Sequence, residues 1–109
     1  MAWSEISVTE AAGLLSSGHQ IHLVDVREQD EYAICHIDKS EHLPLSGFRG
    51  DGSEVSWEKS DLILVLCHHG VRSLHAARYF DQLGYEDVRS IAGGIDRWAI
   101  EVDAEIPRY

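Results

Sequence analysis

The sequence predicts an α/β domain with a central, mostly parallel sheet and helices on both of its faces. Short apolar stretches typical of strands alternate with segments of helical periodicity, the order expected for a parallel sheet. The run Leu62–Leu66 is apolar at every position, which indicates a strand buried on both faces. The chain has 109 residues, of which 44% are hydrophobic and 26% charged, so we expect one domain over residues 1–109.

The first half of the chain opens with a helix signal. Ser7 and Glu10 form an S-x-x-E capping box, and apolar residues at helical spacing follow. Gly18 is the expected stop of this helix. The next predicted elements are a strand over 21–25, an acid-rich helix over 28–34, a short strand over 41–45 and a long loop over 46–56.

The second half is predicted to continue the alternation. Behind the buried strand, apolar side chains at helical spacing predict a helix from about residue 73 to 83, which Gly84 would end. A strand over 88–91 follows, and the pair Gly93 and Gly94 leads into a last helix. The apolar faces of these two helices consist of Ala76, Ala77, Phe80 and Leu83 in one, and Ile95, Trp98 and Ala99 in the other.

Charge and composition argue against several classes of function. The chain has 19 acidic and 9 basic residues, a net charge of −10, and no basic patch suited to nucleic acid or an anionic membrane. No stretch approaches the ~20 apolar residues that span a bilayer, and the N-terminus lacks a signal-peptide pattern. We therefore expect a cytoplasmic protein. Two cysteines are too few for a disulfide framework or a zinc ribbon.

The main candidate site is the segment Cys67–Ser73, between the buried strand and its helix. Sites in open α/β folds gather at the carboxyl ends of strands. Backbone N–H groups of such a loop can converge on an anion, the helix N-terminus adds partial positive charge, and Arg72 adds a full one. These features favour a thiolate, which predicts Cys67 as a nucleophile. Gly70 permits a tight loop, and Ser73 either caps the helix or donates its hydroxyl to the loop.

With these residues the sequence resembles the rhodanese-like sulfurtransferase family, and it looks like a single-domain rhodanese. The resemblance covers nearly the whole chain. Cys67 is often followed by arginine in the family, where this chain has His68, and the position of Cys35 is usually glycine. The matching stretches, in order, are Leu23–Arg27 with Glu31-Tyr32 and His36-Ile37, then the loop Cys67–Ser73, then Ala92–Ile95 with Trp98, and last the end of the chain with Val102-Asp103 and Pro107-Arg108-Tyr109.

The resemblance implies a thiosulfate sulfurtransferase that works through a persulfide on Cys67, without a metal or organic cofactor. Its partners would be a small sulfur donor such as thiosulfate and an acceptor, which is cyanide in an assay and a thiol or a sulfur-accepting protein in the cell. Asp25 and Arg27 would support the site, chiefly as a structural ion pair. The loop residues that would bind the donor are His68, His69, Gly70, Val71, Arg72 and Ser73. Histidines in loops are, however, more often solvated or hydrogen-bonded bystanders than functional groups.

Other functions remain open at this level. Phosphatases and arsenate reductases of the same fold have five residues between cysteine and arginine, whereas four separate Cys67 from Arg72, which favours sulfur transfer. Regulatory modules of the family usually lack the nucleophile, which is present in this chain, but a module that only carries a persulfide between partners fits as well. Cys35 is either a packed small residue or a resolving partner for Cys67.

Overall fold

A five-stranded parallel sheet forms the centre of the molecule. The computed structural model describes residues 3–18 and 20–109, and in it the strands lie in the order β1-β5-β4-β2-β3. Every neighbouring pair is parallel, which confirms the predicted sheet. The strands are β1 (Trp3–Ile6), β2 (Ile21–Asp25), β3 (Glu41–His42), β4 (Leu62–Leu66) and β5 (Asp87–Ile91).

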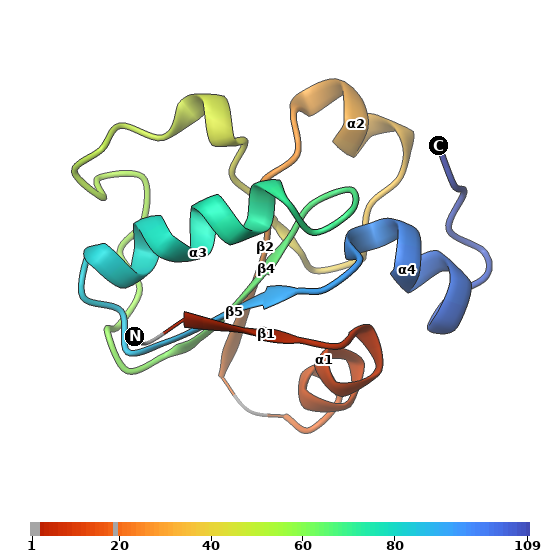
Figure 1. Ribbon diagram of the computed structural model, residues 1–109, viewed down its shortest axis with the longest axis horizontal. Coiled ribbons are helices and arrows are strands. Elements are labelled where there is room, and N and C mark those ends of the chain that lie inside the picture. The colour runs from red at the N-terminus through yellow and green to blue at the C-terminus, as the bar shows by residue number, and fades with distance from the viewer. Residues whose placement is uncertain (1–2, 19) are drawn as a thin grey trace.

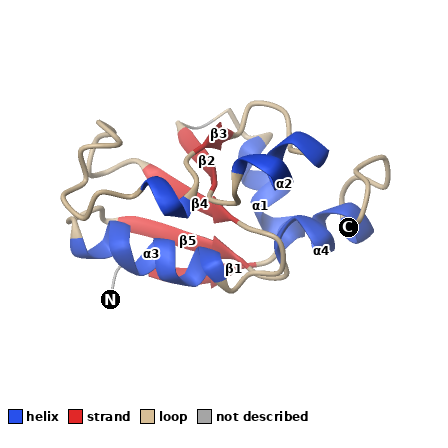
Figure 2. Cartoon of the chain, turned by 90° about the horizontal axis from the view of Figure 1, so that it is seen from above, coloured by secondary structure: helices blue, strands red, loops and turns tan. Residues whose placement is uncertain are grey.

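Helices cover both faces of this sheet, as predicted. Helix α3 packs on one face, and α1 and α4 pack together on the other (Figures 1 and 2). Helix α2 lies at the carboxyl end of the strands, next to the loop that follows β4 (Figure 1). Among the helices that the structure describes, none has the length and apolar character needed to cross a membrane. Their bounds are α1 (Val8–Leu15), α2 (Gln29–Ile34), α3 (Arg72–Gln82) and α4 (Gly94–Glu101), with a short 3-10 helix at Leu45–Gly47.

The core consists of two apolar layers, one on each face of β4. Leu64 and Leu66 face α1 and α4, while Ile63 and Val65 face α3, and all four side chains are fully buried. This alternation explains why Leu62–Leu66 is apolar at every position, since both faces of a central parallel strand are covered. The central strand therefore holds the residue that follows it in a rigid setting.

The structure differs from the sequence-based expectation at three places. Strand β1 was not predicted, because it is a short edge strand whose only fully buried residue is Ile6. The expected strand over 41–45 ends at His42, since Pro44 has no N–H group for a sheet and instead precedes the 3-10 helix. Helix α3 begins at Arg72, one residue earlier than expected, and Ser73 does not cap it.

Candidate active site

Cys67 lies directly after β4 and is 1% exposed. Its Sγ accepts a hydrogen bond from the Gly70 backbone N–H at 3.0 Å, and it lies 3.4 Å from the hydroxyl of Ser73. The Ser73 hydroxyl is in turn 2.7 Å from that of Ser90 on β5. Gly70 has φ +100, a conformation that glycine adopts without strain. The sulfur therefore faces a backbone N–H and a hydroxyl, both of which can donate to a sulfur anion.

The N-terminus of α4 fixes the first half of the loop. The N–H of Ile95 donates to the Cys67 carbonyl at 2.8 Å, and the N–H of Asp96 donates to the His68 carbonyl at 3.1 Å. This contact needs glycine at position 94, because a Cβ there would lie 2.4 Å from both carbonyl oxygens. The close approach of α4 thus sets the backbone on which Cys67 is presented.

Arg72 forms a two-pronged ion pair with Glu31 of α2. Its Nη1 lies 2.5 Å from Oε1 and its Nη2 lies 2.7 Å from Oε2 of that carboxylate. The hydrogen bond from Arg72 is the main reason that the pKa of Glu31 falls to about 2. Glu31 also accepts from the Glu28 backbone N–H at 3.2 Å and from the Tyr109 hydroxyl at 3.0 Å. The charge of Arg72 is therefore already paired.

Asp25 and Arg27 form a second ion pair, which is fully buried at the end of β2. The Arg27 Nη2 lies 2.7 Å from Asp25 Oδ2, and both side chains are 0% exposed. Burial alone would lower the pKa of Arg27, but the hydrogen bonds to Asp25 and to Tyr109 raise it. Other donors of Arg27 reach the carbonyl of Cys35 at 2.6 Å and the Tyr109 hydroxyl at 2.9 Å. The pair ties the loop after β2 to the chain's C-terminal segment.

The two loop histidines have different surroundings. His68 stacks on His69 and on Tyr109, with ring centroids 3.9 Å apart in both cases. Burial, followed by the charge of His69, lowers the pKa of His68. The His69 side chain is 62% exposed, and its Nδ1 lies 3.9 Å from the carboxylate of Asp96. His68 is therefore packed against the C-terminal segment, while His69 faces solvent.

The C-terminal segment closes one side of the loop. Figure 1 shows the chain passing α4 and ending beside α2. Tyr109 contacts His68 through its ring, and its hydroxyl contacts both Arg27 and Glu31. Arg108 adds an ion pair with Asp96 at 2.8 Å. On the other side, Val71 is 64% exposed at the surface of the loop.

Glu31 and Tyr109 are the residues of this site that sequence reasoning missed. The sequence identifies Glu31 only as an acid near a helix start and as part of a family signature, and it identifies Tyr109 only as part of the family-like end of the chain. Glu31 and Arg72 lie 41 positions apart, and Glu31 and Tyr109 lie 78 apart, so no local spacing connects them. The available signals were the acid at position 31 in the first family signature, which could pair with the only arginine of the loop, and the family-like end that contains Tyr109.

Cys35 and Cys67 lie in different layers of the core. Its thiol is close to the carbonyl of Pro107, at 3.4 Å, and its side chain belongs to the layer that packs against α1 and α4. Cys67 belongs to the opposite layer, and both cysteines are free thiols. The structure thus places Cys35 as a packed small residue.

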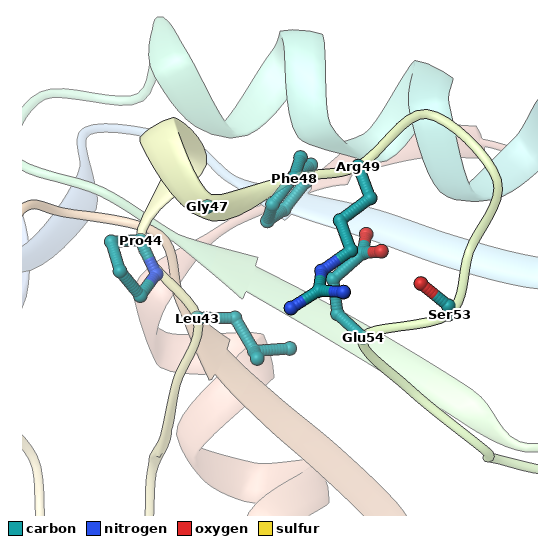
Figure 3. Close-up of a pocket in the computed structure, with 7 residues that line it drawn as sticks. All are labelled: Leu43, Pro44, Gly47, Phe48, Arg49, Ser53 and Glu54. Atoms are coloured by element: carbon teal, nitrogen blue, oxygen red, sulfur yellow. The ribbon is translucent and has the colours of Figure 1, made fainter.

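A separate cavity lies in the long loop that precedes β4. It is formed by the segment 43–54, below α3, and Arg49 and Glu54 project into it (Figure 3). The hydroxyl of Tyr79 on α3 donates to Glu54 at 2.6 Å and holds this loop against the helix. None of the lining residues belongs to the segment Cys67–Ser73, so this cavity is separate from the loop that follows β4.

Comparison with known proteins assigns the family. The profile of the rhodanese-like domain matches residues 7–101, which is most of the chain. The chain belongs to the rhodanese-like domain family. One similar solved structure is a rhodanese-like domain protein from Staphylococcus aureus, with a TM-score of 0.79 and 23% sequence identity; the match covers 100% of this chain and 99% of that chain. Another is the human single-domain sulfurtransferase TSTD1, with a TM-score of 0.75 and 27% sequence identity; the match covers 89% of this chain and 96% of that chain.

Curated members of the family with clear sequence similarity are sulfurtransferases. Thiosulfate sulfurtransferase GlpE from Coxiella burnetii is 33% identical over 98 residues, which cover 90% of this chain and 89% of the relative. Adenylyltransferase and sulfurtransferase uba4 from Ogataea parapolymorpha is 32% identical over 96 residues. The match covers 87% of this chain but only 24% of that longer protein. The rhodanese-like resemblance seen in the sequence is therefore confirmed at the level of family and fold.

Proposed function

We propose that this rhodanese-like chain is a sulfurtransferase that moves a sulfane sulfur from a donor such as thiosulfate, through a persulfide on Cys67, to a thiophilic acceptor. The observation that carries the proposal is the setting of Cys67. Its sulfur accepts the Gly70 N–H at 3.0 Å at the end of a buried strand, and Arg72 ends the same loop. Similarity to thiosulfate sulfurtransferases supports this reaction class.

In the first step the Cys67 thiolate attacks the outer sulfur of the donor. A sulfur–sulfur bond forms to Cys67, the bond inside the donor breaks, and its electron pair leaves with sulfite when the donor is thiosulfate. The N–H of Gly70 and the hydroxyl of Ser73 are positioned to donate hydrogen bonds to the sulfur anion that results. Arg72 would orient the donor through its planar, two-pronged guanidinium.

In the second step the acceptor attacks the outer sulfur of the Cys67 persulfide. The electron pair of the broken bond returns to Cys67, so the thiolate is restored and the cycle needs no external oxidant or reductant. Cyanide serves in an assay, and a thiol or a sulfur-accepting protein would serve in the cell. We place this reaction in the cytoplasm, where thiols are kept reduced, which suits two free cysteines.

Loop length favours sulfur transfer over hydrolysis of phosphate esters. Four residues separate Cys67 from Arg72. The loop turns back tightly, because the N–H of Gly70, only three residues after Cys67, donates to the Cys67 sulfur. A phosphatase loop of this fold is one residue longer and makes a cradle for a tetrahedral phosphate. The loop of this chain is suited to a single sulfur atom on Cys67.

The test is a steady-state comparison of two reactions. We expect thiosulfate:cyanide transfer by the wild type and no appreciable hydrolysis of an aryl phosphate. Cys67→Ser should abolish the transfer, while the matched control Cys35→Ser should retain it. Aryl phosphate hydrolysis that disappears in Cys67→Ser would overturn the proposal, as would unchanged sulfur transfer in that variant.

A further inference from the structure

The ion pair between Arg72 and Glu31 leaves the active loop with little net positive charge. Arg72 is the only lysine or arginine in the segment 67–73. Each of its two terminal nitrogens donates one hydrogen bond to the Glu31 carboxylate. The lowered pKa of His68 keeps that ring mostly neutral near neutral pH. An anionic donor therefore approaches a loop whose fixed cation is compensated, on a chain of net charge −10.

Glu31 is held firmly in this position. Its carboxylate receives Arg72 through both oxygens, the Glu28 backbone N–H and the Tyr109 hydroxyl. These contacts come from α3, from the start of α2 and from the C-terminal segment. The Glu31 side chain is 19% exposed and that of Arg72 is 34% exposed, so the pair lies at the boundary between the protein and solvent. A donor can reach Arg72, but Glu31 remains beside it.

The nearby charges do not restore an excess of positive charge. The Arg27 guanidinium is neutralised by Asp25. On the other side of the loop, the carboxylate of Asp96 faces both Arg108 and the largely exposed His69. A donor with two negative charges is consequently repelled by Glu31 about twice as strongly as a donor with one.

We infer that Glu31 is a specificity-determining residue, which selects sulfur donors of a single negative charge, such as organic persulfides and thiosulfonates, over the thiosulfate dianion. This inference rests on the proposed function and names its substrate class. The shared chemistry of the preferred donors is a terminal sulfane sulfur on a group that carries one charge.

The transfer from such a donor balances without a further reactant. For an ionised persulfide R–S–S⁻ with an uncharged R group, the Cys67 thiolate forms a bond to the terminal sulfur, the donor's S–S bond breaks, and the electron pair leaves as R–S⁻. For a thiosulfonate R–SO₂–S⁻, the leaving group is the sulfinate R–SO₂⁻. In both cases Cys67 receives one sulfur atom in the zero-valent state, as it does from thiosulfate.

The experiment compares two donors that differ in charge. Thiosulfate and methanethiosulfonate both carry a terminal sulfane sulfur, but the first is a dianion and the second a monoanion. Glu31→Gln keeps the shape of the side chain and a hydrogen-bond acceptor but removes its charge. In this variant kcat/KM for thiosulfate should rise about tenfold through a lower KM, and a tenfold rise corresponds to about 1.4 kcal/mol. For methanethiosulfonate the rise should be only about threefold, since its charge is half as large.

The control is Asp30→Asn. Asp30 is the exposed neighbour of Glu31 on α2, so this variant removes the same charge without touching the ion pair. It should leave the ratio of the two kcat/KM values within about twofold of the wild type, because solvent screens an exposed charge. Glu31→Ala removes the same carboxylate and should shift the ratio in the direction seen with Glu31→Gln.

The outcomes separate this inference from the proposed function. If both donors still load Cys67 with one sulfur but the ratio is the same in wild type, Glu31→Gln and Glu31→Ala, the specificity role is wrong and the sulfurtransferase proposal stands. An equal loss for both donors in the two variants would make Glu31 a merely structural residue. If neither donor loads Cys67 in the wild type, the proposed function itself is wrong.

Discussion

Two guanidinium–carboxylate pairs lie at the carboxyl end of the sheet, and they differ in what they can do. Asp25 and Arg27 are both 0% exposed, and other protein groups occupy the remaining donors of Arg27. Arg72 and Glu31 are 34% and 19% exposed. A buried pair cannot exchange its partner without leaving a charge in the protein interior, whereas a partly exposed pair can be separated at a small cost in free energy. The pair of Asp25 and Arg27 is therefore a rigid pair that supports the structure of the site. The pair of Arg72 and Glu31 is an adjustable pair that can rearrange when a ligand binds.

Tyr109 connects the two pairs. Its hydroxyl accepts from Arg27 at 2.9 Å and donates to Glu31 at 3.0 Å. Burial is the main reason that the pKa of Tyr109 rises to about 12, so this hydroxyl keeps its proton at neutral pH. Through Tyr109, the rigid pair thereby helps to fix the position of the Glu31 carboxylate.

The largest expected effect comes from breaking the buried pair. Asp25→Asn leaves the charge of Arg27 without a carboxylate, and we expect a loss of about 3–5 kcal/mol in the free energy of unfolding. Urea unfolding monitored by circular dichroism measures it. Asp30→Asn, an exposed change on α2, should stay within ~0.5 kcal/mol of the wild type. A loss below about 1 kcal/mol in Asp25→Asn would remove the distinction between the two pairs.

Substitutions of Arg72 test the adjustable pair through their effect on the rate of sulfur transfer. Arg72→Ala should lower kcat/KM for sulfur transfer about 100-fold, because it removes the donor-orienting guanidinium. Its unfolding free energy should fall by no more than about 1 kcal/mol, since the pair is partly solvated. Arg72→Lys should recover only part of the activity, because an ammonium lacks the planar two-pronged geometry. Full recovery with lysine would show that charge alone matters.

The contact of α4 with the loop belongs to the rigid part of the site. Gly94→Ala would place a Cβ 2.4 Å from the carbonyl oxygens of Cys67 and His68, and should cost about 1–3 kcal/mol of stability together with activity. Gly13→Ala is the matched control, since a Cβ there meets no atom within 4 Å. That control should be neutral or stabilise by ~0.5–1 kcal/mol. Equal stabilities of the two variants would contradict the described packing.

The smallest effect concerns acid stability. The pKa of Glu31 is lowered from 4.5 to about 2 in the folded chain, so its contribution is present above pH 4.5 and is lost as the pH falls towards 2. The stability difference between wild type and Glu31→Gln should therefore shrink by about 1–2 kcal/mol between pH 5 and pH 2, after allowance for solvent around Arg72. Urea unfolding of both proteins across this range checks it, and a difference independent of pH would refute the pairing.

Sequence reasoning succeeded where the signal is local. The apolar run Leu62–Leu66 identifies a central strand by itself, and the position of Cys67 directly after it follows from adjacency. The edge strand β1 was missed because few of its side chains are buried, so its pattern is weak. For Ser73 the sequence left two roles open, and the structure places its hydroxyl next to Cys67.

The parts that could not be predicted depend on distant contacts. The pairing of Arg72 with Glu31 joins α3 to α2, and only the folded sheet brings these helices together. The same holds for Tyr109, whose ring reaches His68 after the chain has passed α4. The position of Cys67 was therefore predictable, whereas the electrostatic state of the loop was not.

The central claim is that Cys67 carries the transferred sulfur, and intact-mass measurement tests it most directly. Wild type, Cys35→Ser and Cys67→Ser would each be incubated with thiosulfate and separated from excess donor. Their intact masses would then be measured by mass spectrometry under non-reducing conditions. The account predicts a gain of one sulfur atom in the wild type and in Cys35→Ser, its removal by cyanide, and no gain in Cys67→Ser. A sulfur atom retained by Cys67→Ser, or lost only in Cys35→Ser, would contradict it.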